Sequence, residues 1–237
     1  MRPCLIAFLL LATPLIAFAQ DSPSPSPQPS AAGPAPAAST APVPGATPSD
    51  AEAQKLGRLA VADFNKGDME SARRKFAKLL EIEPDNFFGL VNIGTIEYRL
   101  KLWDDAEKHL KRAVRLQPES GPAWLALGAL YCDRDKLDAA LAALSQAVLY
   151  DPRNARAHNY LGVTVGKKGW TSGAEAELQR AVELDPDYAE AHFNLALVYL
   201  QHSPPAIEMA RRHYQRALEL GEKPDPLVEK ALGDDKK

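Results

Sequence analysis

The sequence predicts an all-α protein, built as an α-solenoid of about five helical hairpins with a capping helix at its C-terminal end. Three observations lead to this fold class. Prolines recur every 34 residues, at Pro84, Pro118, Pro152 and Pro186. Small and apolar residues recur on the same spacing, and within each period they stand three or four residues apart, as on one helix face. A fixed period of this length is typical of stacked supersecondary units that bury their apolar faces against each other.

Residues 1–19 have the features of a secretory signal peptide. A basic residue precedes an almost wholly apolar run, which ends at Ala17-Phe18-Ala19, an A-x-A cleavage site. We therefore expect cleavage there and a periplasmic or extracellular location. The alternative is an uncleaved membrane anchor, although the apolar run is short for a membrane span and is interrupted by Pro14.

Residues 20–49 form a low-complexity segment rich in Pro, Ala and Ser. It contains one charged residue, Asp21, one branched aliphatic residue, Val43, and no aromatic residue. Such a segment cannot bury enough apolar surface to offset the entropy of ordering, so we expect a disordered linker. Alternating Ser-Pro favours extended polyproline II, which would make it a semi-rigid spacer. An inert spacer is the simpler interpretation, and a ligand for a proline-binding domain is the alternative.

The solenoid is expected over residues 50–222. Positions in each repeat are counted from the equivalent of Gly121 in the third. Trp124 then stands at position 4 and Gly128 at position 8 of a first helix, and Ala140 at position 20 of a second. Small residues at 8 and 20 let the two helices cross closely, and proline at 32 ends the second helix. The repeats lie near 53–86, 87–120, 121–154, 155–188 and 189–222.

The pattern W-x2-L-G-x2-Y…A-x3-[FL]-x2-A…P resembles the tetratricopeptide repeat (TPR) family, and the match runs from about Ala53 to Gly221. The resemblance implies a right-handed α-solenoid in which the first helices of successive repeats line a concave groove. It also implies a scaffold that binds a protein or peptide in that groove.

Two repeats depart from the pattern. In the fifth, the register of small residues shifts by two, so we expect an insertion of two residues between His202 and Ala206. In the fourth, β-branched residues in the first helix predict the softest interior hairpin. After the last repeat, Asp225-Pro226 resembles a helix start, so residues 223–237 are predicted to hold a capping helix and a charged tail.

The candidate partner-binding residues occupy positions 2, 6, 9 and 13 of the first helices, about opposite the face that packs in the core. They suit an extended peptide, with amides for its backbone, apolar groups for side-chain pockets and cations for acidic groups. We expect the polar members to be exposed and to have no packing role. The alternative is that apolar members pack between adjacent first helices. The predicted site comprises Arg58, Phe88, Asn92, Thr95, Arg99, Arg156, Tyr160, Lys167, Asn194, Leu197 and Gln201.

Chemistry beyond binding has little support in the sequence. Asn92 and Asn194 stand at position 6, as in TPR domains that clamp a C-terminal acidic peptide, but the other residues of that clamp are missing. His158 and His192 share position 4, where packing is the expected role and a metal site the alternative. Cys132 is expected to be a structural thiol. We predict no catalytic residue, no cofactor and no metal.

Charge excludes one class of partner. The chain has a net charge of -3 and no basic stripe, so nucleic acid is not an expected partner. We expect an exported, non-catalytic TPR scaffold or adaptor with a protein or peptide partner, of unspecified oligomeric state. The alternative is a membrane-tethered structural subunit of an envelope complex, held by an uncleaved N-terminal segment. An enzyme subunit is disfavoured because no nucleophile, base or metal ligands cluster in the sequence.

Overall fold

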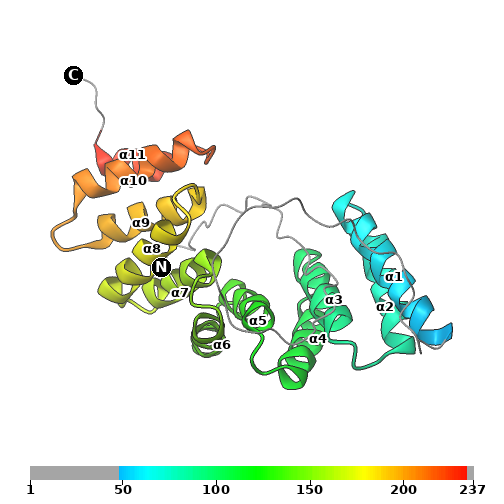
Figure 1. The fold of residues 1–237 in the computed structure, drawn as a ribbon. Coiled ribbons are helices and arrows are strands. Elements are labelled where there is room, and N and C mark those ends of the chain that lie inside the picture. The colour runs from blue at the N-terminus through cyan, green and yellow to red at the C-terminus, as the bar shows by residue number, and fades with distance from the viewer. Residues whose placement is uncertain (1–47, 234–237) are drawn as a thin grey trace, which may run out of the picture. The chain divides into compact units, whose positions relative to one another are not determined.

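The computed structural model describes residues 48–233. The predicted signal peptide (1–19), nearly all of the predicted linker (20–49) and the last four residues of the tail lie outside them. The described residues form eleven α-helices and no strand, which confirms the all-α prediction (Figure 1). The helices are α1 (Pro48–Asn65), α2 (Met69–Ile82), α3 (Phe87–Arg99), α4 (Trp103–Leu116), α5 (Gly121–Asp133), α6 (Leu137–Tyr150), α7 (Ala155–Lys167), α8 (Thr171–Leu184), α9 (Ala189–Gln201), α10 (Ile207–Glu219) and α11 (Pro226–Leu232).

The described residues belong to two compact units, and the division falls inside α3. The first unit ends at Ile93 and the second begins at Gly94. In the first unit, α1 and α2 pack as a hairpin. Ala60 of α1 and Phe76 of α2 are fully buried, which shows that the apolar faces of both helices supply the core of this hairpin.

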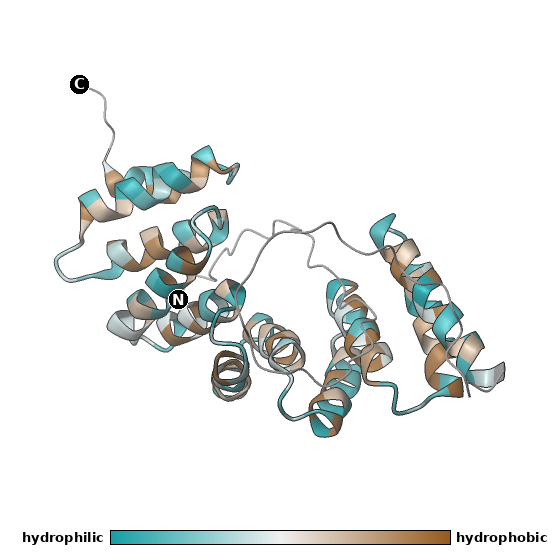
Figure 2. Ribbon diagram, in the orientation of Figure 1, coloured by the Kyte–Doolittle hydropathy of each residue, from teal (hydrophilic) through white to brown (hydrophobic). Residues whose placement is uncertain are grey.

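The second unit is a stack of hairpins. Helices α5 and α6, α7 and α8, and α9 and α10 pair within hairpins, and α4, α6 and α8 each pack on the first helix of the next hairpin (Figure 1). The first helices α5, α7 and α9 also contact one another in sequence order. Figure 2 shows both apolar and polar residues on these helices, as expected of helices that bury one side. The stack confirms the predicted repeat of helical hairpins.

Glycine at position 8 lets a first helix approach the second helix of its own hairpin. A Cβ added to Gly128 would lie 2.6 Å from Leu144 Cγ, and one added to Gly162 would lie 2.7 Å from Leu178 Cγ. A larger residue would therefore overpack the hairpin. We expected alanine at position 20 to face this glycine, but the facing side chain is leucine at 24. Position 20 approaches through its backbone, since the Ala174 carbonyl oxygen lies 3.2 Å from the same added Cβ of Gly162.

The turn inside four hairpins uses one residue in the left-handed region of backbone conformation, at position 15. Gly67 and Gly169 have φ values of 85° and 82°, and Lys101 and Asp135 have φ values of 60° and 56°. Glycine adopts this region without a steric penalty, whereas a side chain costs about 1–2 kcal/mol there. The fold therefore places two strained residues at turns where two other hairpins use glycine.

A polar residue at position 34 caps three of the first helices. The side-chain oxygens of Asn86, Ser120 and Asn154 accept hydrogen bonds from the backbone N–H three residues later, at 2.7, 3.4 and 3.2 Å. Such a cap satisfies an N–H group that the first helical turn leaves without a partner. Tyr188 holds the same position before α9 and makes no side-chain cap. These caps fix where the first helices begin.

The fifth hairpin has the longer turn that the sequence predicts. Helix α9 ends at Gln201 and α10 begins at Ile207, which leaves five residues between them against three in the α5–α6 and α7–α8 turns. The predicted capping helix is α11. Asp225 starts it, because its Oδ1 accepts hydrogen bonds from the backbone N–H groups of Leu227 and Val228 at 2.8 and 3.3 Å.

Helix α11 is fastened to the last hairpin by apolar and polar contacts. It packs on α9 and α10, with Val228 and Leu232 buried. Arg211 of α10 donates a hydrogen bond to the Leu232 carbonyl at 2.9 Å, and the Tyr214 hydroxyl accepts one from the Asp225 N–H at 2.7 Å. The apolar side of the last hairpin is therefore covered within the chain.

Candidate partner-binding face

The predicted site residues fall in both compact units. Arg58, Phe88 and Asn92 belong to the first unit and the other eight to the second. Arg58 is exposed on α1, and Phe88 is half-buried, with its ring edge-on to Phe87 at 5.6 Å between centroids. In the second unit we define the first-helix face by the side chains of Thr95, Tyr98, Arg99, Ala126, Ala129, Asp133, Arg156, Asn159, Tyr160, Lys167, Glu190, Asn194, Leu197 and Gln201.

Two tyrosines from non-adjacent repeats meet over α5. The Tyr98 hydroxyl donates a 2.5 Å hydrogen bond to Asp133 Oδ2, which ties α3 to α5. Tyr160, from α7, lies close enough to interact electrostatically with Tyr98. On this face α5 carries the small side chains of Ala126 and Ala129 besides Asp133, which leaves room for the two tyrosines to approach each other. Small residues in repeat three thus bring repeats two and four into one site.

Burial is the main cause of the shifted pKa values of the two tyrosines and of Asp133. Desolvation raises the pKa of Tyr98, and the neighbouring Tyr160 and Asp133 raise it further. Desolvation also raises the pKa of Asp133, while the hydrogen bond from Tyr98 and the charge of Lys167 act in the opposite direction. Burial raises the pKa of Tyr160 as well. The phenols of Tyr98 and Tyr160 therefore stay protonated at neutral pH and keep their capacity to donate hydrogen bonds.

Two guanidinium groups flank the tyrosines. Arg99 follows Tyr98 on α3, Arg156 lies one turn before Tyr160 on α7, and both arginines are half-buried. Burial lowers the pKa of Arg99, and the positive charge of Arg156 lowers it further, so the two cations repel each other across α5. Within residues 48–233, Arg156 makes no hydrogen bond and no ion pair through its side chain. Its donors are therefore available to a bound group.

Asn159 joins α7 to α9 through three hydrogen bonds. Its Nδ2 donates to Tyr188 Oη at 3.2 Å and to Glu190 Oε1 at 3.3 Å, and its Oδ1 accepts from Asn194 Nδ2 at 3.0 Å. Burial raises the pKa of Glu190, and the bond from Asn159 opposes this shift. Asn194 is only 6% exposed. Our expectation that Asn194 is exposed and has no packing role is wrong, because its amide pairs with Asn159 in the contact between two first helices.

Asn92 also differs from the expected exposed amide. Its side chain is 1% exposed, and its Nδ2 has no hydrogen-bond partner among the described residues. A buried donor without a partner costs about 1–3 kcal/mol. The expectation of exposure is wrong here as well, whereas a role for Asn92 in partner binding stays a prediction.

Lys167 is engaged within the second unit. Its Nζ donates to the Cys132 carbonyl at 3.2 Å and lies 3.5 Å from Asp135 Oδ1. Cys132 itself is 1% exposed, and burial raises the pKa of its thiol against an opposing hydrogen bond with Thr164. The thiol is therefore protonated and inaccessible, as expected of a structural cysteine.

Three predicted members remain. Thr95 and Leu197 are half-buried, on α3 and α9. Gln201 is exposed at the end of α9. In the second unit, Gln201 is thus the predicted site residue that most openly faces solvent, while the arginines and Tyr160 are partly covered.

The ring at position 4 has a structural role in three repeats. Trp124 Nε1 donates to the Pro118 carbonyl at 2.7 Å, and the Nε2 atoms of His158 and His192 each lie 3.1 Å from the carbonyl of the proline six residues earlier. The Nδ1 of His158 lies 2.7 Å from a carboxylate oxygen of Glu177, and this bond raises its pKa. No group of three or more His, Cys, Asp or Glu side chains in the described part of the chain could hold a metal ion. Each of the two histidines therefore ties the start of its first helix to the proline that precedes that helix.

The predicted site omitted four polar side chains that help to build the first-helix face. They are Tyr98, Asp133, Asn159 and Glu190. Tyr98 and Asn159 occupy positions 12 and 5, which lie seven residues apart in the repeat and therefore on one side of a helix. Side chains that can form hydrogen bonds at these two positions were the available signal.

The sequence and the fold both have relatives. Residues 45–226 match the family described as tetratricopeptide repeat protein 21 C-terminal ARM domain. No curated protein matches the chain. Among solved structures, the fold is similar to TTC0263, a thermophilic TPR protein of Thermus thermophilus, at 27% identity and a TM-score of 0.60, covering 76% of this chain and 96% of that one.

Two further structures share the fold. MamA is 26% identical with a TM-score of 0.59, covering 68% of this chain and 94% of MamA. YrrB, described as a TPR protein with an unusual peptide-binding site, is 21% identical with a TM-score of 0.59, covering 76% of this chain and 90% of YrrB, a likeness that shows the fold alone. The family match spans well over half of the sequence and agrees with the stack of helical hairpins. The chain therefore belongs to the tetratricopeptide repeat protein 21 C-terminal ARM domain family and is a TPR-like repeat protein.

Proposed function

We propose that this protein is an exported scaffold or adaptor that binds a protein partner through the first-helix face. One observation carries the proposal. Tyr98, Arg156 and Tyr160, from repeats two and four, converge over the small side chains of α5, and the Arg156 side chain has no hydrogen-bond or ion-pair partner in the described chain. The donors of this half-buried guanidinium make no hydrogen bond within the described residues, and a guanidinium of this kind suits the recognition of another molecule.

The relatives support a binding role. Arrays of helical repeats expose extended surfaces that are used to bind other proteins, and the description of YrrB names a peptide-binding site. The fold does not choose the partner, because function lies in the residues of the site. The half-buried phenols and guanidinium groups favour a protein partner, since Tyr and Arg are enriched where proteins bind each other.

Export is supported by the first 19 residues of the sequence, with their apolar run and the Ala17-Phe18-Ala19 site. In residues 48–233 no helix has both the length and the apolar character needed to cross a bilayer. The mass of the purified native protein tests this part of the proposal. We expect a mature chain that begins at Gln20, and a chain that retains Met1 would favour the membrane-tethered subunit instead.

Site-specific photocrosslinking tests the binding face. A photoreactive amino acid replaces Gln201, which is exposed on the first-helix face, in the full chain expressed in its own host. The matched control replaces Leu149, which is 66% exposed on α6. We expect a discrete adduct with a different protein from position 201 after irradiation of the exported fraction and none of this kind from position 149. Such adducts from position 149 alone would move the interface to the second helices.

A further inference from the structure

We propose that this protein pairs with a second copy of itself, with the outer side of α6 lying antiparallel on the same helix of the other copy. The contact uses a second helix of the repeat, so it does not depend on the proposed binding by the first-helix face. We define the α6 outer face by the side chains of Leu141, Ala142, Ser145, Gln146, Leu149 and Tyr150.

Helix α6 differs from the other second helices of its unit in its lack of charge. Residues 139–150 contain no charged residue, whereas the equivalent segments of α4, α8 and α10 each carry at least four. Arg115, Glu183 and Glu219 stand where α6 has Leu149. A helix that is apolar on all sides is normally covered on all sides, because burial of apolar surface is favourable. The composition of α6 therefore predicts a cover for its outer side.

The chain itself leaves that side open. Leu144 is buried where α6 packs on α5 and α7. On the other side, Leu149 is 66% exposed, the highest value of any large apolar side chain in residues 48–233, and Tyr150 is 39% exposed. Ser145 and Ala142 are exposed in the same stripe, one and two turns before Leu149. The cover must therefore come from another molecule.

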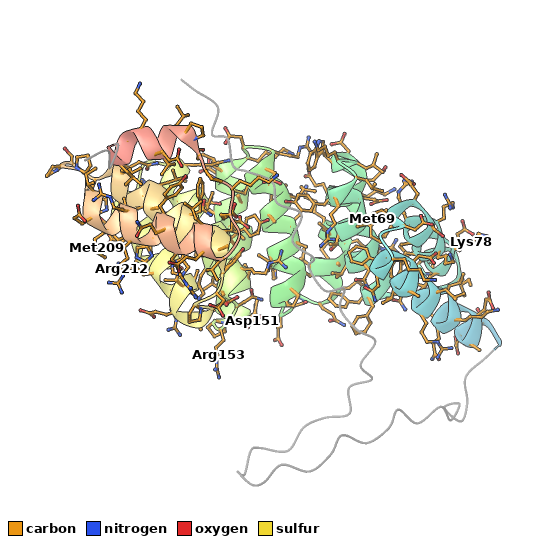
Figure 3. All side chains as sticks on the ribbon, turned by 90° about the horizontal axis from the view of Figure 1, so that it is seen from above. Met69, Lys78, Asp151, Arg153, Met209 and Arg212 are labelled. Atoms are coloured by element: carbon orange, nitrogen blue, oxygen red, sulfur yellow. The ribbon has the colours of Figure 1, made fainter. Side chains whose placement is uncertain are left out.

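The charges at its two ends make this face complementary to itself. Asp138, at the start of α6, is 94% exposed, and one oxygen lies 2.5 Å from Lys168 Nζ, which leaves the second oxygen for another cation. Arg153, just beyond the end of α6, is exposed and makes no hydrogen bond or ion pair within residues 48–233. Figure 3 shows its side chain pointing away from the helices.

An antiparallel pair related by a twofold axis brings these unlike charges together at both ends of the contact. A parallel pair would instead place Asp138 beside Asp138 of the other copy, which costs free energy. Between the ends the face carries no charge, so it meets its own copy without repulsion. A second copy of the chain therefore satisfies the whole face.

The sizes of the side chains fit the same register. A twofold axis between Ser145 and Gln146 places Leu149 of one copy over Ala142 of the other. A large side chain over a small one lets two helices approach closely. The charged residues at the two ends lie equally far from this axis along the chain, so the register that packs the apolar groups also pairs the charges.

Sedimentation velocity of the chain that begins at Gln20 tests the pairing. We expect a monomer–dimer equilibrium with a dissociation constant of the order of 10 μM, since a contact centred on one pair of helices is small for a specific interface. Leu149→Glu should leave only monomer, because the contact would bury a carboxylate without a partner. Leu227→Glu is the matched control, since Leu227 is 62% exposed on α11, and it should pair as the wild type does.

Exchange of the end charges tests the antiparallel orientation. Asp138→Arg and Arg153→Asp should each weaken the dimer roughly tenfold, and the double variant should recover the wild-type affinity. A cysteine near the axis gives a second readout. Ser145→Cys should form a disulfide between two copies under mild oxidation, whereas Ser172→Cys, exposed on α8, should not.

Each outcome decides one part of the proposal. A wild-type chain that stays monomeric, or a dimer that Leu149→Glu leaves intact, would overturn the pairing through α6. Loss of the dimer in Leu149→Glu without recovery in the double charge variant would overturn the antiparallel register. A monomeric chain whose photoreactive residue at position 149 captures a different protein would assign the face to that protein. The sedimentation results do not involve the first-helix face, so failure here is distinguishable from failure of the proposed function.

Discussion

The Nδ1 atoms of His192 and His213 lie 2.9 Å apart, and this contact joins α9 to α10 in the last hairpin. His192 donates from Nε2 to the Pro186 carbonyl, so its Nδ1 accepts and His213 donates. This arrangement needs at least one of the two facing nitrogens to be unprotonated, and it suits two neutral rings. Burial lowers the pKa of both, and the neighbouring His192 and Arg212 help to lower that of His213 to about 4.

We predict that this pair makes the last hairpin sensitive to acid. A histidine whose pKa is lowered by folding stabilises the protein fully above its unfolded pKa of about 6.5, and this contribution is lost as the pH falls toward the folded value. Between pH 6.5 and 4 the wild type should lose of the order of 1–2 kcal/mol more than His213→Gln, after allowance for solvent screening. Urea denaturation across this range measures the difference, and parallel curves would contradict it.

Glu107 is predicted to stabilise the contact between α4 and the α5–α6 hairpin. Its carboxylate lies 2.8 Å from Lys111 Nζ and accepts hydrogen bonds from Arg134 at 3.0 Å and from Lys136 at 2.9 Å. The bond with Lys111, and then that with Lys136, lowers the pKa of Glu107 to about 2 against the opposing effect of burial. Because the pKa is lowered by folding, this stabilisation is present above about pH 4.5 and is lost as the pH falls toward 2.

Glu107→Gln should therefore reduce the free energy of unfolding by about 1–2 kcal/mol at pH 7, a value discounted because the lysines are largely exposed. At pH 3 the variant and the wild type should differ by less. Glu183→Gln is the control, since Glu183 makes an exposed pair with Arg180 in one helix and should change stability by about 0.5 kcal/mol or less. A deficit that does not change with pH would assign the effect to packing.

The strained turns predict a stabilising substitution. Lys101 is exposed and has a φ of 60° at the position where Gly169 has a φ of 82°. Lys101→Gly should raise the free energy of unfolding by about 1 kcal/mol, and Gly169→Ala should lower it by a similar amount. Lys108→Gly, on the exposed side of α4, is a control of opposite sign, because glycine inside a helix costs about 1 kcal/mol. Equal losses in both Lys→Gly variants would refute the argument from backbone strain.

The buried amide pair predicts a loss of stability. Asn194→Ala leaves Asn159 Oδ1 without its 3.0 Å partner and should cost about 1–3 kcal/mol. Gln201→Ala, on the exposed end of the same helix, should change stability by about 0.5 kcal/mol or less. Denaturation of both variants and of the double variant Asn159→Ala with Asn194→Ala provides the test. The double variant should lose less than the sum of the single losses, and strict additivity would show that the two amides are not coupled.

Features that depend on the 34-residue register could be predicted from the sequence. The hairpins, the two-residue insertion after Gln201 and the capping helix begun by Asp225 all follow from residues close in the chain. The first-helix face could be predicted only in part, because it depends on contacts between repeats. Whether Tyr98 meets Tyr160 is decided by the small residues of a third helix, which no local pattern reports.

The pKa values of the two histidines at position 4 also depend on residues outside the local sequence. His158 and His192 hold one position of the repeat and make the same bond to a proline carbonyl. Their pKa values shift in opposite directions, upward for His158 and downward for His192. Glu177 at position 23 raises the pKa of His158, whereas His192 has His213 in place of a carboxylate there and burial lowers its pKa. Reading two positions together would have predicted the difference.

The packing of α11 on the last hairpin determines where a further hairpin could be added to this protein. The buried side chains of Val228 and Leu232 use the apolar side of the last hairpin. A copy of a hairpin added after α11 would therefore find no exposed apolar surface to pack on. A copy inserted just after Gly221 could instead pack on the α9–α10 hairpin, and α11 could then pack on the inserted copy. Growth of the array is thus possible at an internal joint, with the terminal helix moving outward each time.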